Sequence, residues 1–421
     1  MNSVNKSRIN QKGSILPLAV VMIVILALIG LGLLRLGLNA RLQAIRSTSS
    51  LAARAAADAG LTQAVQMMKA KLISDGNSWN NSTLPAQTSP YSIAGNAYGD
   101  ASYTFNITGN PAAGFTINST GTSANIQKTV HCLRVFKSAW FGIGVKEGVT
   151  LKTNAILATI PDGGELKIQT NSTGANEVVL NSGVIINGDV VVGPGGNTDN
   201  IISIKQNADI TGNAYPAGEP ISFKDVTAPT LPAPPWPAPD ANGNIILNSS
   251  AQYNGTIQIA STVKVKSNDP TNPHVIIYFP GNVTLKNGAK LVIAENTVLD
   301  LYVGAILRAD YGSQITNDNI PSSGTPTDAQ ITAAATSFFI YGTPTCSEIN
   351  LGNSSDLYGA IYAPNANLTI FNSGNLYGAY VGNQSVEIKN SGGFYFVSAL
   401  LDIVGANQPT TYFGKARWWE E

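Results

Sequence analysis

The sequence predicts a mainly β protein in which one long N-terminal α-helix precedes a small β-meander and a large right-handed β-solenoid (β-helix). An uncharged apolar run near the start leads into an alanine-rich stretch, and together they favour one continuous helix. Short apolar strings between Asn-Gly, Asn-Ser-Gly and Gly-Gly turns fill the remainder, a pattern typical of β-structure. Hydrophobic residues make up 43% of the 421 residues and charged residues 12%, so a large core can form despite the low charge.

The composition excludes several functional classes. With 25 basic and 25 acidic residues the net charge is zero, which argues against a nucleic-acid-binding face. Two cysteines and two histidines are too few for a Cys-ligated zinc site, a disulfide scaffold or a His-rich metal site. The glycine-rich residues 192–196 lack the Lys-Ser/Thr pair of a phosphate-binding loop. We therefore expect no cofactor, no metal and no nucleic-acid partner.

The first element is an apolar run from Ser14 to Leu34, 21 residues without a charge. As a helix it would span roughly 31 Å, the thickness of the hydrocarbon core of a bilayer. A cleaved secretory signal is the alternative, but such a signal has an apolar region of about 7–15 residues followed by a cleavage site. We therefore predict a retained transmembrane half-helix over residues 14–34, after a polar leader of residues 1–13.

The helical pattern continues beyond the apolar run. Residues 51–61 are rich in alanine, the best helix former. Leu61, Val65, Met68 and Leu72 recur at spacings of four, three and four, which places them on one helical stripe. The sequence therefore predicts one helix over residues 14–75 with an amphipathic second half.

A small antiparallel meander is expected over residues 76–137. Residues 103–107, 114–121 and 129–135 alternate apolar and polar side chains, and Gly and Asn turns separate them. Such a sheet could pack on the amphipathic half of the helix.

The N-terminal region resembles the type IV pilin family, and most of all the PilX-type minor pilins. The resemblance rests on Lys12-Gly13 before the apolar run and on Ala56-Ala-Asp-Ala-Gly-Leu61. It implies that a prepilin peptidase cuts between Gly13 and Ser14, on the cytoplasmic side of the inner membrane. Leu18 stands where major pilins carry a glutamate, as in minor pilins and the tip subunit of secretion pseudopili.

What this resemblance implies for location and partners is specific. The precursor would be a single-pass protein of the bacterial inner membrane with a cytoplasmic N-terminus, and the mature protein would reach a pilus or the cell surface. Its partners would be other pilins or pseudopilins, bound through the N-terminal helix.

Residues 138–405 carry the solenoid pattern. Leu357-Tyr-Gly-Ala360 recurs nineteen residues later as Leu376-Tyr-Gly-Ala379, and Asn-Ser-Gly turns recur at a similar interval. A period near twenty with short strands is typical of a β-solenoid. A β-sandwich of hairpins is the alternative, because Asn-Gly is also the best hairpin turn. The region resembles the β-rich domain found behind PilX-like N-termini, which carries no activity known to us.

Three segments interrupt or follow this pattern. A proline-rich strap over residues 226–240 is expected to run along the solenoid in an extended conformation and to join its two parts, with Trp236 against the surface. Residues 327–336 favour a short helical insertion or a loop. In the C-terminal tail, residues 406–421, the pair Trp418-Trp419 is expected to cap one end of the solenoid.

The sequence gives little indication of a catalytic site. Candidate carboxylates that no sequence pattern pairs are Asp162, Glu165, Asp189, Asp199, Asp300, Asp310 and Asp318, with Arg308 between two of them. A glycosidase would need such groups clustered, so we expect no enzyme. Cys132 and Cys346 could form a disulfide in an exported protein, or remain two buried thiols. Tyr358 and Tyr377 hold equivalent repeat positions and would form a surface aromatic ladder, with contact to a glycan or host ligand as the alternative role.

The sequence favours a non-enzymatic, minor-pilin-like component of a type IV pilus or type II secretion pseudopilus that displays the solenoid for adhesion or assembly. Two alternatives stay open: a surface-anchored carbohydrate-active enzyme and a membrane-tethered structural polymer built by end-to-end stacking.

Overall fold

A computed structural model describes most of the chain. The described residues are 15–75, 84–92, 101–110, 114–134, 136–137, 140–164, 166–218, 220–221, 223–269, 271–321, 323–382, 384–403, 412–413 and 417–420. They divide into two compact units. Unit 1 contains the helix up to Ala70 together with the described residues of 79–134 and 415–421, and unit 2 contains residues 71–75 and the described residues of 135–414.

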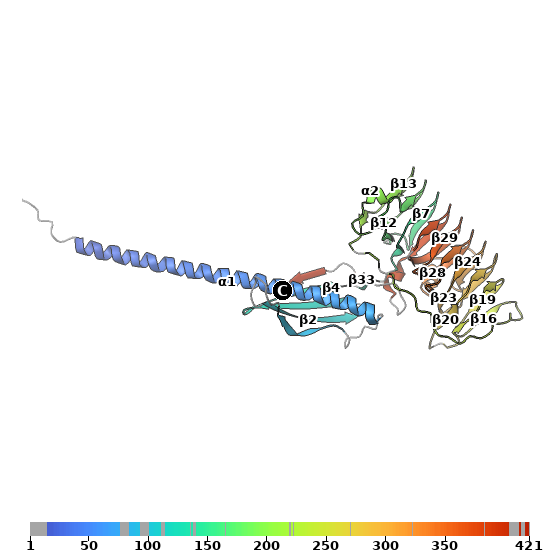
Figure 1. The fold of residues 1–421 in the computed structure, drawn as a ribbon, viewed down its shortest axis with the longest axis horizontal. Coiled ribbons are helices and arrows are strands. Elements are labelled where there is room, and N and C mark those ends of the chain that lie inside the picture. Colours follow the sequence, from blue (N-terminus) through green and yellow to red (C-terminus); the bar gives the residue numbers. More distant parts are fainter. Residues whose placement is uncertain are drawn as a thin grey trace, which may run out of the picture. The chain divides into compact units, whose positions relative to one another are not determined.

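The predicted long N-terminal helix is confirmed. The helix α1 (Ile15–Asp75) is continuous over 61 residues and is drawn in blue in Figure 1. Its first half is apolar and exposed. In its second half the buried side chains are almost all small: Ala52, Ala53, Ala56, Ala57, Ala64 and Met68.

This buried stripe differs from the one that the sequence favours. Met68 lies on it, but Leu61 and Val65 are only partly buried. The sheet below the helix supplies the volume instead, because its inner face carries Tyr103, Phe105 and Phe115. Alanine on the helix then lets the two backbones come close, so the large side chains of the predicted stripe are displaced toward the edge of the contact.

The sheet of unit 1 is antiparallel and has five strands in the order β1-β2-β3-β4-β34. Their bounds are β1 (Gln87–Ser92), β2 (Ala101–Asn110), β3 (Gly114–Ser123), β4 (Ile126–Arg134) and β34 (Arg417–Glu420). The first four strands follow the chain as a meander, and the fifth comes from the C-terminal tail.

The tail corrects one prediction. Trp418 and Trp419 were expected to cap an end of the solenoid, but β34 pairs with β4 of unit 1, with Trp418 opposite Cys132 and Trp419 opposite His131. The backbone of the strand satisfies the open edge of β4, which a cap on another unit could not do. Unit 2 is therefore an insertion between two neighbouring strands of unit 1.

Helix and sheet of unit 1 meet at very short range. A Cβ atom on Gly121 would lie 1.9 Å from the carbonyl oxygen of Ala53, and a Cβ on Gly60 would lie 2.4 Å from Oγ of Ser119. The buried Ser119 hydroxyl donates a hydrogen bond of 2.7 Å to the carbonyl of Ala57. Glycine at position 121 is therefore required by the approach of the helix backbone.

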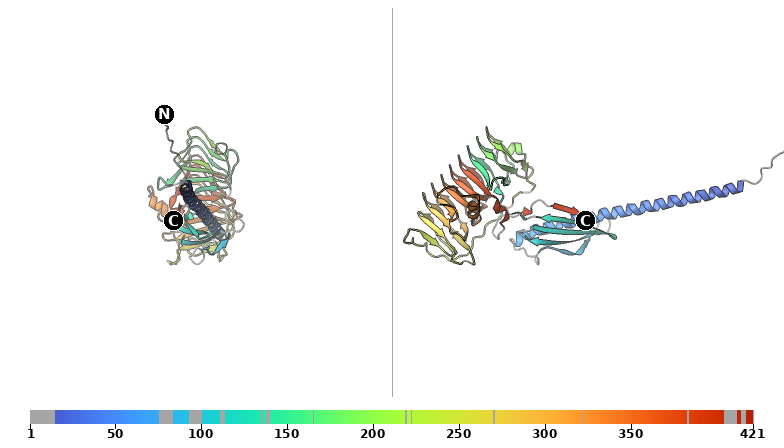
Figure 2. Two further views of the ribbon diagram at one scale, coloured as in Figure 1. Left: turned by 90° about the vertical axis from the view of Figure 1, so that its left-hand side faces the viewer. Right: turned by 180° about the vertical axis from the view of Figure 1, so that it is seen from behind.

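The strands of unit 2 pair in parallel and fall into three rows, seen as stacked arrows in Figure 1 and from behind in Figure 2. The first row contains β16 (Ile245–Leu247), β19 (Thr262–Val265), β22 (Lys290–Ile293), β25 (Gln314–Asn317), β28 (Asp356–Ala363), β30 (Asn375–Gly382), β32 (Gly393–Val397), β8 (Ile156–Ile160), β11 (Ile185–Ile186) and β14 (Asp209–Ile210). The other two rows have the same order along the stack.

The second row contains β17 (Ala251–Gln252), β20 (His274–Phe279), β23 (Val298–Val303), β26 (Phe338–Gly342), the later parts of β28 and β30, β6 (Gly142–Val145), β9 (Leu166–Thr170), β12 (Gly188–Val192) and β15 (Ala214–Pro216). The third row is a nine-stranded sheet of β18 (Ile257–Ile259), β21 (Val283–Leu285), β24 (Ile306–Ala309), β27 (Glu348–Leu351), β29 (Asn367–Ile370), β31 (Val386–Ile388), β7 (Val149–Leu151), β10 (Val178–Leu180) and β13 (Ile202–Ile204). Parallel pairing is incompatible with the hairpin sandwich that was the alternative.

Three short helices and one pair of strands complete the described part of unit 2. They are α2 (Thr198–Ile201), α3 (Asp328–Ala335), the 3₁₀ helix η1 (Ser398–Asp402) and the antiparallel pair of β5 (Phe136–Lys137) with β33 (Tyr412–Phe413). The helix α3 falls within the predicted insertion 327–336. Inward side chains of all three rows form one continuous apolar core.

Corners of the stack use a recurring turn. Ser354, Ser373 and Ser391 have φ of 55°, 56° and 57°, each directly after an asparagine. The backbone amide of Ser354 donates to the carbonyl of Asn372 in the next layer at 3.2 Å. In the Asn-Ser-Gly turns at residues 372–374 and 390–392 serine is therefore the left-handed residue, whereas in the turn at residues 181–183 it is Gly183, with a φ of 78°.

The order of strands along the stack is not the order along the chain. The segment 142–216 and the segment 245–397 each form part of the stack, and they meet where β30, β31 and β32 pair with β6, β7 and β8. The chain therefore enters and leaves this stack at neighbouring layers.

A crossing segment, residues 217–244, links the far ends of these two parts and has no regular secondary structure in its described residues. It includes the predicted strap. The Asn171 amide exchanges two hydrogen bonds of 2.7 Å with the backbone of Ile221. The Tyr362 hydroxyl donates to the carbonyl of Lys224 at 2.6 Å and accepts from its amide at 2.7 Å.

Farther along, the carbonyl of Pro232 accepts a hydrogen bond from the amide of Gln252 at 2.8 Å. Trp236 packs edge-on against Tyr253, with ring centroids 5.0 Å apart. These partners lie in the turn after β9, in β28, in β17 and in the loop after β17. The crossing segment therefore runs along the second row from one part of the stack to the other end.

We predict that Gly121→Ala destabilises unit 1 by about 2–3 kcal/mol, because a methyl group there overlaps the helix backbone. Hydrogen–deuterium exchange of peptides from β2 to β4, measured on the full chain in detergent, should show faster exchange. Gly37→Ala is the matched control, since nothing lies within 4 Å of its added methyl. Equal protection in both variants would contradict the close helix–sheet contact.

We predict that Tyr362→Phe loosens the crossing segment. The substitution leaves the amide and carbonyl of Lys224 without their partner, which costs about 1–3 kcal/mol. Exchange at the amides of Ile221 and Lys224 should accelerate, whereas Tyr358→Phe, which removes no hydrogen bond in the described part of the chain, should leave it unchanged. If both variants behave alike, the hydroxyl does not hold the segment.

Candidate interaction surfaces

The exposed half of α1 is the largest unpartnered apolar surface in the described chain. Large side chains from Leu16 to Leu38 are 46–79% exposed, among them Leu16 at 79% and Ile25 at 46%. The helix is long and apolar enough to cross a membrane, and none of its most apolar window is buried. Exposing so large an apolar surface to water is unfavourable, so this half of the helix is suited to contact with lipid or with other apolar helices.

Gly30, Gly32 and Gly37 lie on this half, and an added Cβ at each meets nothing within 4 Å. Their presence does not serve packing within the described chain. Small residues on an apolar helix allow another helix to approach closely. The predicted processing residues Gly13 and Ser14 lie outside the described residues.

The predicted tyrosine ladder forms a stack of three rings. Tyr358 and Tyr377 are parallel within 4° with centroids 4.5 Å apart, and Tyr377 stacks on Tyr395 at 4.8 Å. Our sequence reasoning missed Tyr395, although it lies three residues after Gly392 as Tyr377 lies three after Gly374. The stacked faces of these rings cover one another, Tyr358 is only 6% exposed, and Tyr377 and Tyr395 are partly buried. The ladder therefore lies largely within the wall of the stack and not on its surface.

The carboxylate of Asp356 lies beside the tyrosine ladder and accepts one side-chain hydrogen bond. Oδ1 of Asp356 accepts a hydrogen bond of 2.8 Å from the amide of Asn375 in the next layer. Burial raises the pKa of Asp356, and the Asn375 hydrogen bond lowers it in part. Burial and the nearby Asp356 carboxylate also raise the pKa of Tyr358 and of Tyr377.

Among the candidate carboxylates, Asp300 has the pKa that departs most from its ordinary value. Its side chain is 17% exposed and Oδ2 lies 4.0 Å from Nδ1 of His274. Burial raises the pKa of Asp300 to about 6, against the opposing effect of His274. The ring of Tyr341, which packs 5.1 Å from that of Tyr302, has its pKa raised by burial and by this carboxylate.

Three of the other carboxylates have separate partners. Asp310 pairs with Arg308 at 2.7 Å, Asp318 with Lys264 at 2.7 Å, and Asp189 accepts from the amide of Asn213 at 2.8 Å. Asp162 and Asp199 are exposed, and Glu165 lies outside the described residues. The described residues thus bring no pair of these candidates together, and they contain no group of three potential metal ligands.

The two cysteines are free thiols and form no disulfide. Cys132 is buried in β4 of unit 1 and Cys346 is buried in the core of unit 2, so each lies within a different compact unit. Burial raises the pKa of Cys346 to about 12, which keeps it a thiol. Of the two alternatives that the sequence leaves open, the structure has two buried thiols.

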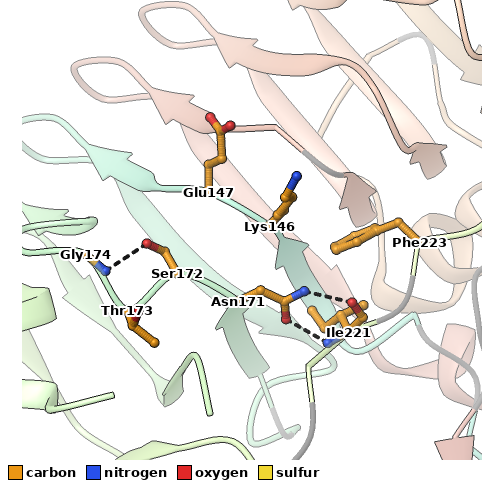
Figure 3. A pocket seen from close by; sticks show the side chains of 8 residues that line it. All are labelled: Lys146, Glu147, Asn171, Ser172, Thr173, Gly174, Ile221 and Phe223. Carbon is orange, nitrogen blue, oxygen red and sulfur yellow. Dashed lines mark hydrogen bonds between the residues drawn. The ribbon is translucent and has the colours of Figure 1, made fainter. Parts of the chain in front are cut away.

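Among the described residues, two pockets on the surface of unit 2 stand out by their volume. One, of about 560 Å³, lies between the turn after β6, the turn after β9 and the crossing segment, as Figure 3 shows. Its wall is mixed, with charged Lys146 and Glu147 opposite Phe223, and the Asn171 amide in it is already bonded to Ile221. The other, of about 650 Å³, lies beside α3 and has no charged side chain in its lining.

Comparison with known proteins adds little beyond these observations. A family model described as a domain of unknown function (DUF7305) matches residues 240–403. No curated protein matches the chain.

Two solved structures show weak similarity. The competence-associated pilin ComZ from Thermus thermophilus has 13% identity and a TM-score of 0.22, covering 89% of this chain and 98% of its own. A glycosylated ice-binding protein, LeIBP, from an Arctic yeast has 13% identity and a TM-score of 0.24, covering 61% and 94%. At such scores neither likeness carries an argument about this chain.

We predict that the stability of unit 2 depends on pH through Asp300. Because the folded pKa of about 6 lies above the usual 3.9, the folded state holds the proton more tightly, and stability falls as pH rises from about 4 to 6. Asp300→Asn should remove this slope and stabilise unit 2 at pH 7 by up to about 2 kcal/mol.

Denaturant unfolding of the full chain at pH 4, 5, 6 and 7 measures the effect. The exposed Asp162→Asn variant is the control and should keep the slope of the unsubstituted protein. An Asp300→Asn variant with an unchanged slope would show that this carboxylate is not the titrating group.

Proposed function

We propose that the protein is a minor-pilin-like component of a type IV pilus or a type II secretion pseudopilus, processed by a prepilin peptidase between Gly13 and Ser14. One observation carries the proposal: a single helix whose first half is apolar and exposed and whose second half packs on an antiparallel sheet. The exposed half then serves two settings in turn, the inner membrane and a bundle of neighbouring pilin helices. Its glycines provide the close approach that such a bundle needs.

The rest of the proposal concerns unit 2. The three parallel rows support a right-handed β-solenoid, because parallel crossovers are right-handed in about 98% of cases. A core that runs through every layer makes this unit a stiff body for display on the cell surface, in adhesion or in assembly. We propose display without catalysis, since the described candidate carboxylates either have separate partners or, like Asp162 and Asp199, are simply exposed.

The membrane-tethered polymer is less well supported. The tail does not cap the stack, but α2 packs next to β13 and β15, the terminal strands of two rows, and the crossing segment bonds to β17 at the opposite end. The bond to β17 covers part of one end on which another copy would have to stack, whereas β15 and Ile204 are exposed at the other end.

We predict that co-expression with a prepilin peptidase yields a protein that begins at Ser14, whereas expression without it leaves residues 1–13 in place. N-terminal sequencing and intact mass measure the result. Gly13→Leu should block the cut, and Gly37→Ala should not. An unprocessed N-terminus in both strains, or a product cut behind Leu34, would refute the pilin assignment.

A further inference from the structure

The stack departs from its regular repeat between β25 and β26. Residues 318–337, between β25 and β26, leave the stack and return to it, whereas β28 and β30 pass the same corner without a break. A long excursion in an otherwise economical repeat often serves a purpose of its own. Here it builds α3 and, beside it, the uncharged pocket.

The wall formed by α3 is rigid. Thr327 and Gln330 form a capping box, in which Oε1 of Gln330 accepts a hydrogen bond of 2.9 Å from the amide of Thr327. Ile331, Ala334 and Ala335 anchor the helix in the core of unit 2. Ala333, on the other side of α3, is exposed and lines the pocket.

The lining is composed of amides and hydroxyls with a small apolar part. The polar lining residues are Asn296, Thr297, Asn317, Asn319, Thr336 and Ser337, and the apolar ones are Pro273, Val298 and Ala333. The only carboxylate between two of the polar residues, Asp318, is neutralised by Lys264 at 2.7 Å. A ligand matched to this wall is neutral and rich in groups that both donate and accept hydrogen bonds.

Two of the polar residues are fixed in advance. Asn317 is 2% exposed; its Nδ2 donates to Oγ of Ser337 at 2.9 Å and its Oδ1 accepts from the amide of Asn319 at 2.8 Å. Thr297 is 3% exposed, and its hydroxyl oxygen accepts from the amide of Ser267 at 3.1 Å. Such fixed groups bind without a further cost of ordering.

Two further amides keep bonding capacity. Within the described part of the chain, the side chains of Asn296 and Asn319 have no hydrogen bond, and Asn296 is held exposed at a φ of 58°. A carboxamide offers donors and acceptors side by side, which matches adjacent hydroxyl groups. The volume of about 650 Å³ lies in the range of small-molecule sites, about 300–1,000 Å³.

From this we infer that the pocket beside α3 binds a neutral oligosaccharide, whose hydroxyl groups bond to the amides of Asn296 and Asn319 and to the hydroxyl of Thr297. The inference deepens the proposed display function and rests on it for its biological setting. The pocket of Figure 3 is a poorer candidate for a neutral ligand, because it places the charged Lys146 and Glu147 at its wall.

The test uses the full chain in detergent micelles and isothermal titration with maltotriose, cellotriose and mannotriose, and with trigalacturonate as the charged counterpart. At least one neutral trisaccharide should bind in the millimolar range or tighter, and trigalacturonate at least tenfold more weakly. No binding of the neutral sugars at 10 mM, about the upper limit of a weak specific site, would overturn the inference.

Paired variants locate the site. Ala333→Trp fills the pocket and should weaken binding at least tenfold, while Ala329→Trp, equally exposed on the same helix but outside the lining, should leave it unchanged. Asn319→Ala should weaken binding about tenfold, the value of one good hydrogen bond, and Asn287→Ala at an exposed corner should not. Binding that survives Ala333→Trp would place the sugar elsewhere and refute the assignment.

The same variants separate this inference from the pilin proposal. Ala333→Trp lies far along the chain from Gly13 and should be processed by the peptidase as the unsubstituted protein is. Loss of sugar binding with normal processing supports the site, and absence of binding in every form with normal processing removes the site but leaves the pilin proposal standing.

Discussion

Unit 2 depends on one joint. β30, β31 and β32 pair in parallel with β6, β7 and β8, strands that lie more than 200 residues earlier in the chain. These pairs join two parts of the stack that the crossing segment links along the chain. The joint also brings the entry and exit of the stack to adjacent layers, and this closeness is what permits insertion between β4 and β34.

Local pattern allowed much of the architecture to be predicted. The helix follows from composition over many residues, and the recurring Leu-Tyr-Gly-Ala strings do lie in register, with Tyr358 opposite Tyr377. The order of the strands along the stack could not be predicted from the sequence, because the pairing of Tyr380 with Ile143 leaves no pattern in either segment. The return of Trp418 to Cys132 is of the same kind, since a four-residue strand has no period from which a partner could be inferred.

The packing of α1 shows another limit. Periodicity identifies a face of the helix, but it does not reveal how large the side chains are on the sheet that packs against it. The sequence therefore favours the stripe with Leu61 and Val65 over the alanines that are buried. Only the combination of alanine on the helix with Gly121 and aromatic residues on the sheet indicates a close contact. The pocket beside α3 was missed for a related reason: Asn296 and Asn319 look like ordinary corner residues until the corners are stacked.

The two units also differ in what surrounds their polar groups. In unit 1 the exposed half-helix carries almost no polar side chain, whereas unit 2 places hydroxyls, amides and paired charges outward over an apolar core. The low overall charge is therefore not uniform along the chain. It averages an apolar helix surface suited to lipid or other helices with a polar surface of unit 2 suited to water.

The insertion of unit 2 has a consequence for biosynthesis. A ribosome delivers β4 long before β34, and every layer of the stack is translated between them. During that interval the hydrogen-bonding groups along one side of β4 have no strand beside them. The sheet of unit 1 can therefore gain its fifth strand only after the whole stack has been translated.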